Sequence, residues 1–239
     1  MEYVQAQFSL KFEPQIRIRR YANQIEDFLQ QYYGTPQTMP IPDEFAAEAP
    51  RIIINSKNGH SQISFSQISV DFMVNFDGEY KNQFTLTKEY ITARLELLKG
   101  LLKEIDIYSF YFAGITYNVH LDTHGKSAVD YLKDLLGVSI TPTEKIYEAS
   151  QRIAYVEEEL FFVNEQIGTY KQYEGRGNSI PNLMNYKNSN LVAEGINLSL
   201  DVNNRYRYLM NGDSIQIKEL TAVIEKIYGI VERNFSKWS

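Results

Sequence analysis

The residues best suited to chemistry lie in residues 118–127 (NVHLDTHGKS), which hold two of the three histidines in the chain. Alternate side chains of an extended strand share a face, so His120, Asp122 and His124 are expected on one side. Imidazole and carboxylate groups bind zinc, iron and manganese. Three such positions span about 13 Å of strand, so a single ion requires a bend, which Gly125 permits. The spacing therefore predicts a divalent-metal or acid–base site at His120, Asp122 and His124.

The same stretch contains the second half of a phosphate-binding loop. Gly125, Lys126 and Ser127 match the end of the pattern G-x-x-x-x-G-K-[ST], but His120 occupies the position of the first glycine. A structural interpretation explains these residues without any function, because Ser127 is a good cap for a helix over residues 128–136 and Gly137 a good end for it. On that interpretation the stretch is a strand, a turn and a helix, with a polar face and no cofactor.

The composition limits the classes of partner. The chain has no cysteine, which excludes disulfides, thiolate metal sites and a cysteine nucleophile. Its net charge of −6 weakens any attraction to nucleic acid or to anionic membranes. Two local patches, residues 17–20 (RIRR) and the pair Arg205 and Arg207 between tyrosines, keep nucleic-acid binding as an alternative.

The location is expected to be cytoplasmic. No apolar run approaches the roughly 18 residues of a membrane span. The first residues (MEYVQAQFSLKF) contain an early acidic residue and alternate apolar with polar positions, unlike a signal peptide.

The first half of the sequence carries strand and helix signals in turn. Alternation predicts strands at residues 3–12 and 111–124, and three-four spacing predicts helices at residues 15–33 and 87–105. Asn58 and Gly59 between two isoleucine-rich runs predict a hairpin. The apolar positions change from odd to even after Phe65, so a bulge or break is expected at Ser66 and Gln67.

The second half shows a longer periodic pattern. Thr141, Pro142 and Glu144 form a capping box at a helix start. Apolar residues then recur at three-four spacing, which predicts a long amphipathic helix over about residues 142–173. A short strand at residues 196–202 and a C-terminal helix follow. The long helix predicts an interaction surface made by Ile146, Ile153, Val156, Leu160, Val163 and Ile167.

These patterns together indicate an α+β protein with an N-terminal antiparallel sheet and packed helices. Residues 1–138 are expected to form the sheet-containing part and residues 139–239 a helical part with one short strand, packed together as one unit. The sequence favours a binding or scaffold protein over an enzyme. We expect it to form a homodimer, or to bind another protein, through helical surfaces. A metal-assisted hydrolase centred on His120, Asp122 and His124 is the first alternative, and nucleic-acid binding is the second.

Overall fold

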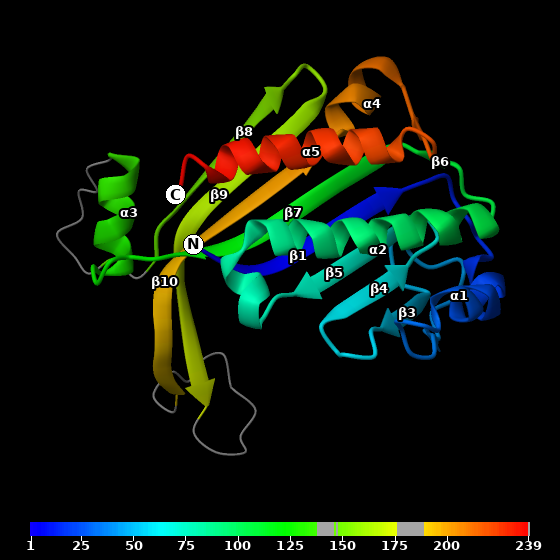
Figure 1. The fold of residues 1–239 in the computed structure, drawn as a ribbon, viewed down its shortest axis with the longest axis horizontal. Helices are drawn as coiled ribbons and strands as arrows, with labels where there is room; N and C mark the ends of the chain where they lie inside the picture. The colour runs from blue at the N-terminus through cyan, green and yellow to red at the C-terminus, as the bar shows by residue number, and fades with distance from the viewer. Residues whose placement is uncertain (138–145, 147, 176–188, 239) are drawn as a thin grey trace.

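The computed structural model describes residues 1–137, 146, 148–175 and 189–238 of the chain. Helices and strands are mixed along the sequence, and two long helices lie side by side across one face of a large sheet (Figure 1). The α+β prediction is confirmed. The sheet is larger than the sequence indicated, because the second half of the chain contributes strands to it.

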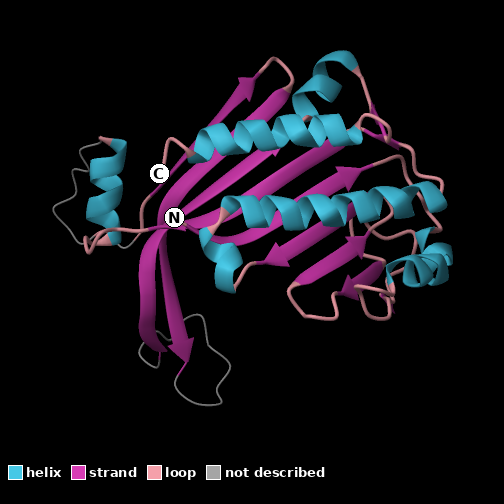
Figure 2. Ribbon diagram, in the orientation of Figure 1, coloured by secondary structure: helices cyan, strands magenta, loops and turns pink. Residues whose placement is uncertain are grey.

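Within the described residues the main sheet has nine strands, all paired antiparallel (Figure 2). In spatial order they are β2 (Gln37–Thr38), β3 (Ile52–Asn55), β4 (Ser61–Phe65), β5 (Ser69–Asn75), β1 (Glu2–Lys11), β7 (Phe112–Leu121), β10 (Ser189–Asn203), β9 (Phe161–Gly175) and β8 (Ser150–Glu157). The first strand of the chain thus lies in the middle, between β5 and β7.

The strand predictions for the first half are confirmed. In β1 the residues Ala6, Phe8 and Leu10 are buried, as the alternation indicates. Asn58 and Gly59 lie in the turn between β3 and β4, where Gly59 has a φ of 77°. The expected break follows Phe65, where β4 ends before β5 begins at Ser69.

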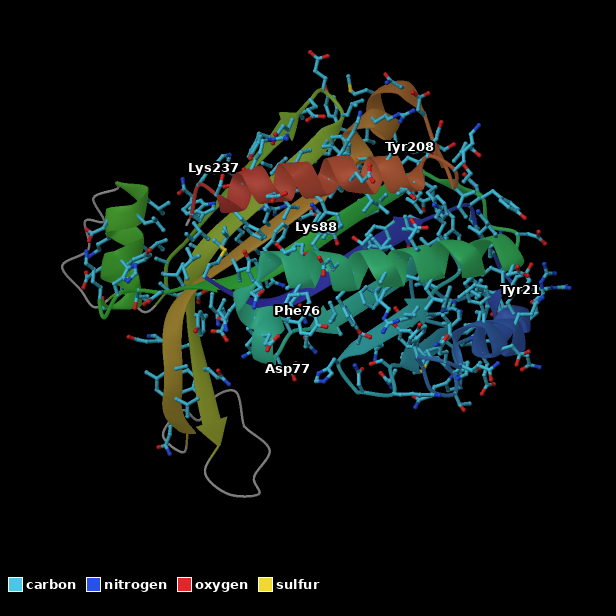
Figure 3. The ribbon with its side chains drawn as sticks, viewed as in Figure 1. Tyr21, Phe76, Asp77, Lys88, Tyr208 and Lys237 are labelled. Carbon is cyan, nitrogen blue, oxygen red and sulfur yellow. The ribbon has the colours of Figure 1, made fainter. Side chains whose placement is uncertain are left out.

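Two helices cover one face of the sheet and enclose the core. The apolar stripe of α2 (Phe84–Glu104) and that of α5 (Leu220–Phe235) are both buried, which confirms these two helices. Lys88 of α2 connects them, because its Nζ lies 3.6 Å from Glu232 Oε2 and 5.5 Å from the centre of the Tyr228 ring (Figure 3).

Shorter elements complete the chain. A 3-10 turn η1 (Ile18–Tyr21) leads into α1 (Ala22–Leu29), and η2 (Gly78–Asn82) leads from β5 into α2. The strands β6 (Ser109–Phe110) and β11 (Ile215–Gln216) form a separate two-stranded sheet, and α4 (Arg205–Asn211) follows β10. The predicted helix α3 (Ala128–Leu136) has its caps where expected: Ser127 Oγ accepts a hydrogen bond from the Asp130 amide, and Gly137 has a φ of 62°.

The long amphipathic helix predicted over about residues 142–173 is wrong. In the described part of that range, β8 and β9 pair as an antiparallel hairpin. Its turn contains Glu158 and Glu159, each with a φ of 54°, and two consecutive residues of positive φ fit a tight hairpin turn. Thr141, Pro142 and Glu144, interpreted as a capping box, lie outside the described residues.

The second half is therefore not mainly helical. The short strand expected at residues 196–202 is part of the longer β10, which pairs with β7 on one side and β9 on the other. One sheet thus includes strands from both of the expected parts, residues 1–138 and residues 139–239. The last part of β9 and the first part of β10, which pair with each other, bend away from the rest of the sheet (Figure 1).

Among the described residues, no helix combines the length and the apolar character needed to cross a membrane.

Candidate functional site

The face of the sheet opposite α2 and α5 carries hydrogen-bonding side chains over its central and last strands. Along β1, β5, β7, β9 and β10 buried apolar residues alternate with more exposed polar ones, and the register places the polar residues of β8 on the same face. We call this the polar face, and its main residues are Gln7, Ser9, Gln62, Asp71, Thr116, Asn118, His120, Ser150, Arg152, Asn164, Gln166, Tyr170, Asn197, Ser199 and Asp201.

Asp201 is a partly buried acid of the polar face. Asn164 Nδ2 and Asn203 Nδ2 donate to its Oδ2 at 2.8 and 2.9 Å, and Thr116 Oγ1 donates to its Oδ1 at 3.4 Å. Burial raises the pKa of the Asp201 carboxyl, and these three hydrogen bonds act in the opposite direction. The network fixes the side chains of three neighbouring strands, β7, β10 and β9.

His120 stacks on Tyr170 across β10. The two ring centres are 4.0 Å apart and the planes differ by 17°. Gly195 of β10 lies directly opposite Tyr170, and a Cβ at Gly195 would lie 2.9 Å from the tyrosine ring. The missing side chain at Gly195 therefore leaves the space that Tyr170 needs to reach His120.

The environment of His120 favours its neutral form. Burial lowers the pKa of His120; nearby Glu2 opposes this shift and Lys81 adds to it. Glu2 itself pairs with Lys81, whose Nζ lies 2.9 Å from Glu2 Oε1. The imidazole therefore presents one donor and one acceptor at neutral pH rather than a positive charge.

Asp122 and His124 lie apart from His120, in the exposed turn that follows β7. The His124 amide donates to Asp122 Oδ1 at 2.8 Å, and His124 Nδ1 lies 3.6 Å from Asp122 Oδ2. No cluster of three or more histidine, aspartate, glutamate or cysteine residues within the described ranges is arranged to hold a metal ion. The metal site and the hydrolase built on it stay predictions without supporting geometry.

A hollow of about 360 Å³ opens on the polar face around the stacked rings of His120 and Tyr170. Three amide side chains line it, those of Gln166, Gln172 and Asn197. Hydroxyl groups and one acid from β8, β9 and the segment before β8 complete the lining, namely Ser150, Thr169 and Glu148.

The residues predicted to form a helical interaction surface do not form one surface in the structure, because they lie on different strands and faces of the sheet. Val163 and Ile167 of β9 are buried in the core, whereas Ile153 and Val156 of β8 have 49% and 40% of their surface exposed. Ile146 and Leu160 are partly buried. Because side chains alternate along a strand, Ile153 and Val156 lie on opposite faces of β8.

The two basic patches contain arginines that already have acidic partners. Arg19 forms an ion pair with Asp43 and donates to the carbonyl oxygen of Ile41. Arg207 Nε lies 3.6 Å from Asp213 Oδ2. The structure does not join the two patches into one surface by any contact of the described residues, and nucleic-acid binding stays a prediction.

The sequence interpretation missed Gln166, Tyr170 and Asn197, which surround His120. The even-numbered positions of β9 are polar or small from Asn164 to Gln172, and this alternation was the available signal. The helical interpretation of that stretch concealed it.

No known family model and no curated protein matches this sequence, so its function is inferred from its own geometry.

Proposed function

We propose that the protein is a binding protein that forms a homodimer through its edge strand β8. The observation that carries this proposal is the exposure of Ile153 and Val156 on β8, the last strand of the sheet. Within the described residues, β8 pairs with β9 alone. Its outer side is available for main-chain pairing with a further strand.

The two edges of the sheet differ in a way that supports pairing at β8. The opposite edge strand, β2, has only two residues and is flanked by Pro36 and Pro40, which limit pairing because proline lacks an amide hydrogen. By contrast, β8 has eight residues and contains no proline or lysine. Its charged residues are Arg152 and Glu157 alone, so it has few of the features that usually protect an edge strand from association.

A twofold axis perpendicular to the sheet at Ala154 pairs two β8 strands antiparallel. Residues opposite one another then share a face, so Ile153 meets Tyr155 of the second copy on the side of α5. Arg152 meets Val156 of the second copy on the polar face, where its aliphatic stem covers the valine. The small side chain of Ala154 allows the strands to approach at the axis.

The test measures mass in solution by size-exclusion chromatography with light scattering. We expect a dimer for the wild-type chain, and a monomer with an unchanged circular-dichroism spectrum for Ile153→Lys and Val156→Lys. Ile16→Lys is the matched control, because Ile16 is 62% exposed in a loop outside the sheet. A monomeric wild-type protein, or a dimer that persists in both β8 variants, contradicts the proposal.

A cross-link tests the register. The chain has no cysteine, so Ala154→Cys introduces a single thiol. Oxidation is expected to give a covalent dimer, because the two thiols lie at the axis. Gln37→Cys on β2 is the control and is expected to stay monomeric under the same oxidant.

A further inference from the structure

The hollow around His120 and Tyr170 has the size and lining of a ligand site. Its volume of about 360 Å³ lies within the range of about 300 to 1,000 Å³ typical of small-molecule sites. It opens on the polar face, whereas the proposed dimer uses the outer side of β8. Ligand binding in the hollow can therefore be tested separately from self-association.

The lining is almost free of formal charge. Glu148 is the one acid among the described lining residues, none of which is a lysine or arginine. His120 is half-buried, and its lowered pKa keeps the ring neutral at neutral pH. A phosphate or carboxylate ligand needs cationic partners or aligned donors, so this lining does not suit an anion.

The polar groups of the lining both donate and accept hydrogen bonds. The amides of Gln166, Gln172 and Asn197 each offer an NH₂ group and a carbonyl oxygen. The hydroxyl of Ser150 offers both functions as well. A ligand hydroxyl also donates one hydrogen bond and accepts two. Such a lining matches a ligand that carries several hydroxyl groups and no charge.

The stacked rings provide the apolar part of the site. Tyr170 is held against His120 at 4.0 Å, and its position depends on the missing side chain of Gly195. Aromatic rings placed beside hydrogen-bonding groups accept the C–H face of a sugar ring while its hydroxyls reach the surrounding amides. Rings fixed before binding lose little conformational entropy on contact.

We propose that this hollow binds a neutral polyhydroxylated ligand, namely a sugar unit of an uncharged oligosaccharide. The aromatic pair contacts the C–H face of the sugar ring. Its hydroxyl groups bind to Gln166 of β9 and to Asn197 of β10, two amides that both line the hollow.

The test titrates the full chain with maltohexaose, cellohexaose and the hexamer of N-acetylglucosamine, followed by isothermal calorimetry and by NMR. We expect at least one of these neutral probes to bind. Asn197→Ala and Gln166→Ala are each expected to weaken that binding about tenfold, the effect of losing one well-placed hydrogen bond. Tyr170→Ala is expected to abolish it, whereas Tyr170→Phe, which keeps the ring, retains most of it.

The matched control is Gln62→Ala, because Gln62 lies on the same polar face but on β4, outside the hollow. Its binding is expected to equal that of the wild-type chain. Oligothymidine and a heparin hexasaccharide serve as anionic probes and are expected not to bind. The proposal is overturned if none of the three neutral probes binds, if Gln62→Ala weakens binding as much as Asn197→Ala, or if only the anionic probes bind.

Discussion

The Tyr155 hydroxyl of the edge strand β8 lies 2.8 Å from Asn234 Oδ1 of the C-terminal helix α5. The same hydroxyl lies 2.8 Å from Glu165 Oε1 of β9, and Lys237 Nζ lies 5.8 Å from the centre of the Tyr155 ring (Figure 3). The last strand of the sheet is thus connected to the last helix of the chain. This contact holds β8 in place beneath α5, although among the described residues the strand is paired on one side only.

Tyr155→Phe is expected to lower the free energy of unfolding by about 1 kcal/mol, because it removes a partly buried hydrogen bond and keeps the ring. The measurement is urea denaturation, with hydrogen exchange of the β8 amides as a local probe. Exchange in β8 is expected to rise more than exchange in β1. Tyr131→Phe is the control, because Tyr131 lies on α3, outside the sheet. Equal losses of stability in the two variants would contradict the role of the Tyr155 hydroxyl.

Arg51 is a fully buried guanidinium that organises the loop before β3. Its Nη1 donates to Ala49 O at 2.7 Å, and its Nη2 lies 3.1 Å from the carbonyl oxygens of both Pro42 and Phe45. Arg51→Met is expected to cost about 3 kcal/mol of the free energy of unfolding, because each hydrogen bond to a charged group contributes about 1.5–3 kcal/mol. Arg17→Met, at an exposed position, is the control for loss of charge.

Urea denaturation measures the cost of Arg51→Met, and limited proteolysis shows whether the loop opens. Cleavage within residues 39–50 is expected to become faster in Arg51→Met but not in Arg17→Met. Arg51→Lys is expected to restore only part of the stability, since an ammonium group lacks the planar fork that reaches several carbonyls. Full stability in Arg51→Lys would mean that charge alone is sufficient.

Two glycine-to-alanine changes are expected to change the free energy of unfolding in opposite directions. At Gly114 of β7 a Cβ would lie 2.7 Å from the Asn203 Cβ and 2.9 Å from the Phe112 ring, so Gly114→Ala is expected to cost about 1–3 kcal/mol. At Gly229 of α5 the nearest atom would be Arg233 Nη1 at 3.6 Å, so Gly229→Ala is expected to gain about 0.5–1 kcal/mol through helix propensity. Thermal and urea unfolding measure both. A gain at Gly114 would show that the close approach between β7 and β10 is misjudged, and a loss at Gly229 would contradict the gain expected from helix propensity in α5.

The elements predicted correctly from the sequence are those with one strong local signal. Ile91, Leu95 and Leu98 repeat only at helical spacing, and Asn58 with Gly59 marks a hairpin by backbone geometry alone. The polar side of β7 was also visible in the alternation of Thr116, Asn118 and His120. Such features depend on neighbouring residues and need no knowledge of tertiary contacts.

The β8–β9 hairpin was not predicted, because the apolar residues there fit both the spacing of a helix and the alternation of a strand. Ile153, Val163 and Ile167 satisfy helical spacing, yet they also fall on odd positions, as a strand requires. Their β-branched side chains, with the aromatic residues around them, favour a strand. The turn could not be recognised from the sequence, because Glu158 and Glu159 occupy the positive-φ positions where asparagine and glycine are usual. Pairing with β10 and burial under α5 decide the outcome, and neither is visible locally.

The candidate site was only partly predictable for the same reason. His120 was identified from its own strand, but the stack with Tyr170 requires β10 to lie between β7 and β9 with Gly195 at the crossing point. Such a contact depends on the order of strands in the sheet. Asp122 and His124 were grouped with His120 by assuming that the strand continues, whereas β7 ends at Leu121.

Buried tyrosines make stability depend on alkaline pH. Burial raises the pKa of Tyr33 from its ordinary value of 10.0 to about 12, and it also raises the pKa of Tyr117 and Tyr228. These hydroxyls stay protonated in the folded chain while the same groups ionise in the unfolded chain near pH 10. The unfolded state then binds fewer protons than the folded state, so the free energy of unfolding falls as pH rises from about 10 toward the folded pKa values. Below pH 10 this contribution is fully present and constant.

The measurement is urea denaturation at a series of alkaline pH values, together with tyrosinate absorbance. We expect the 18 tyrosines to titrate in two groups, with the buried group ionising only as the chain unfolds. Tyr33→Phe removes one of the shifted groups, so its stability is expected to fall less steeply with pH than that of the wild-type chain. A single titration of all tyrosines near pH 10 in the folded protein would mean that water reaches the core rings. An unchanged slope in Tyr33→Phe would assign the pH dependence to other groups.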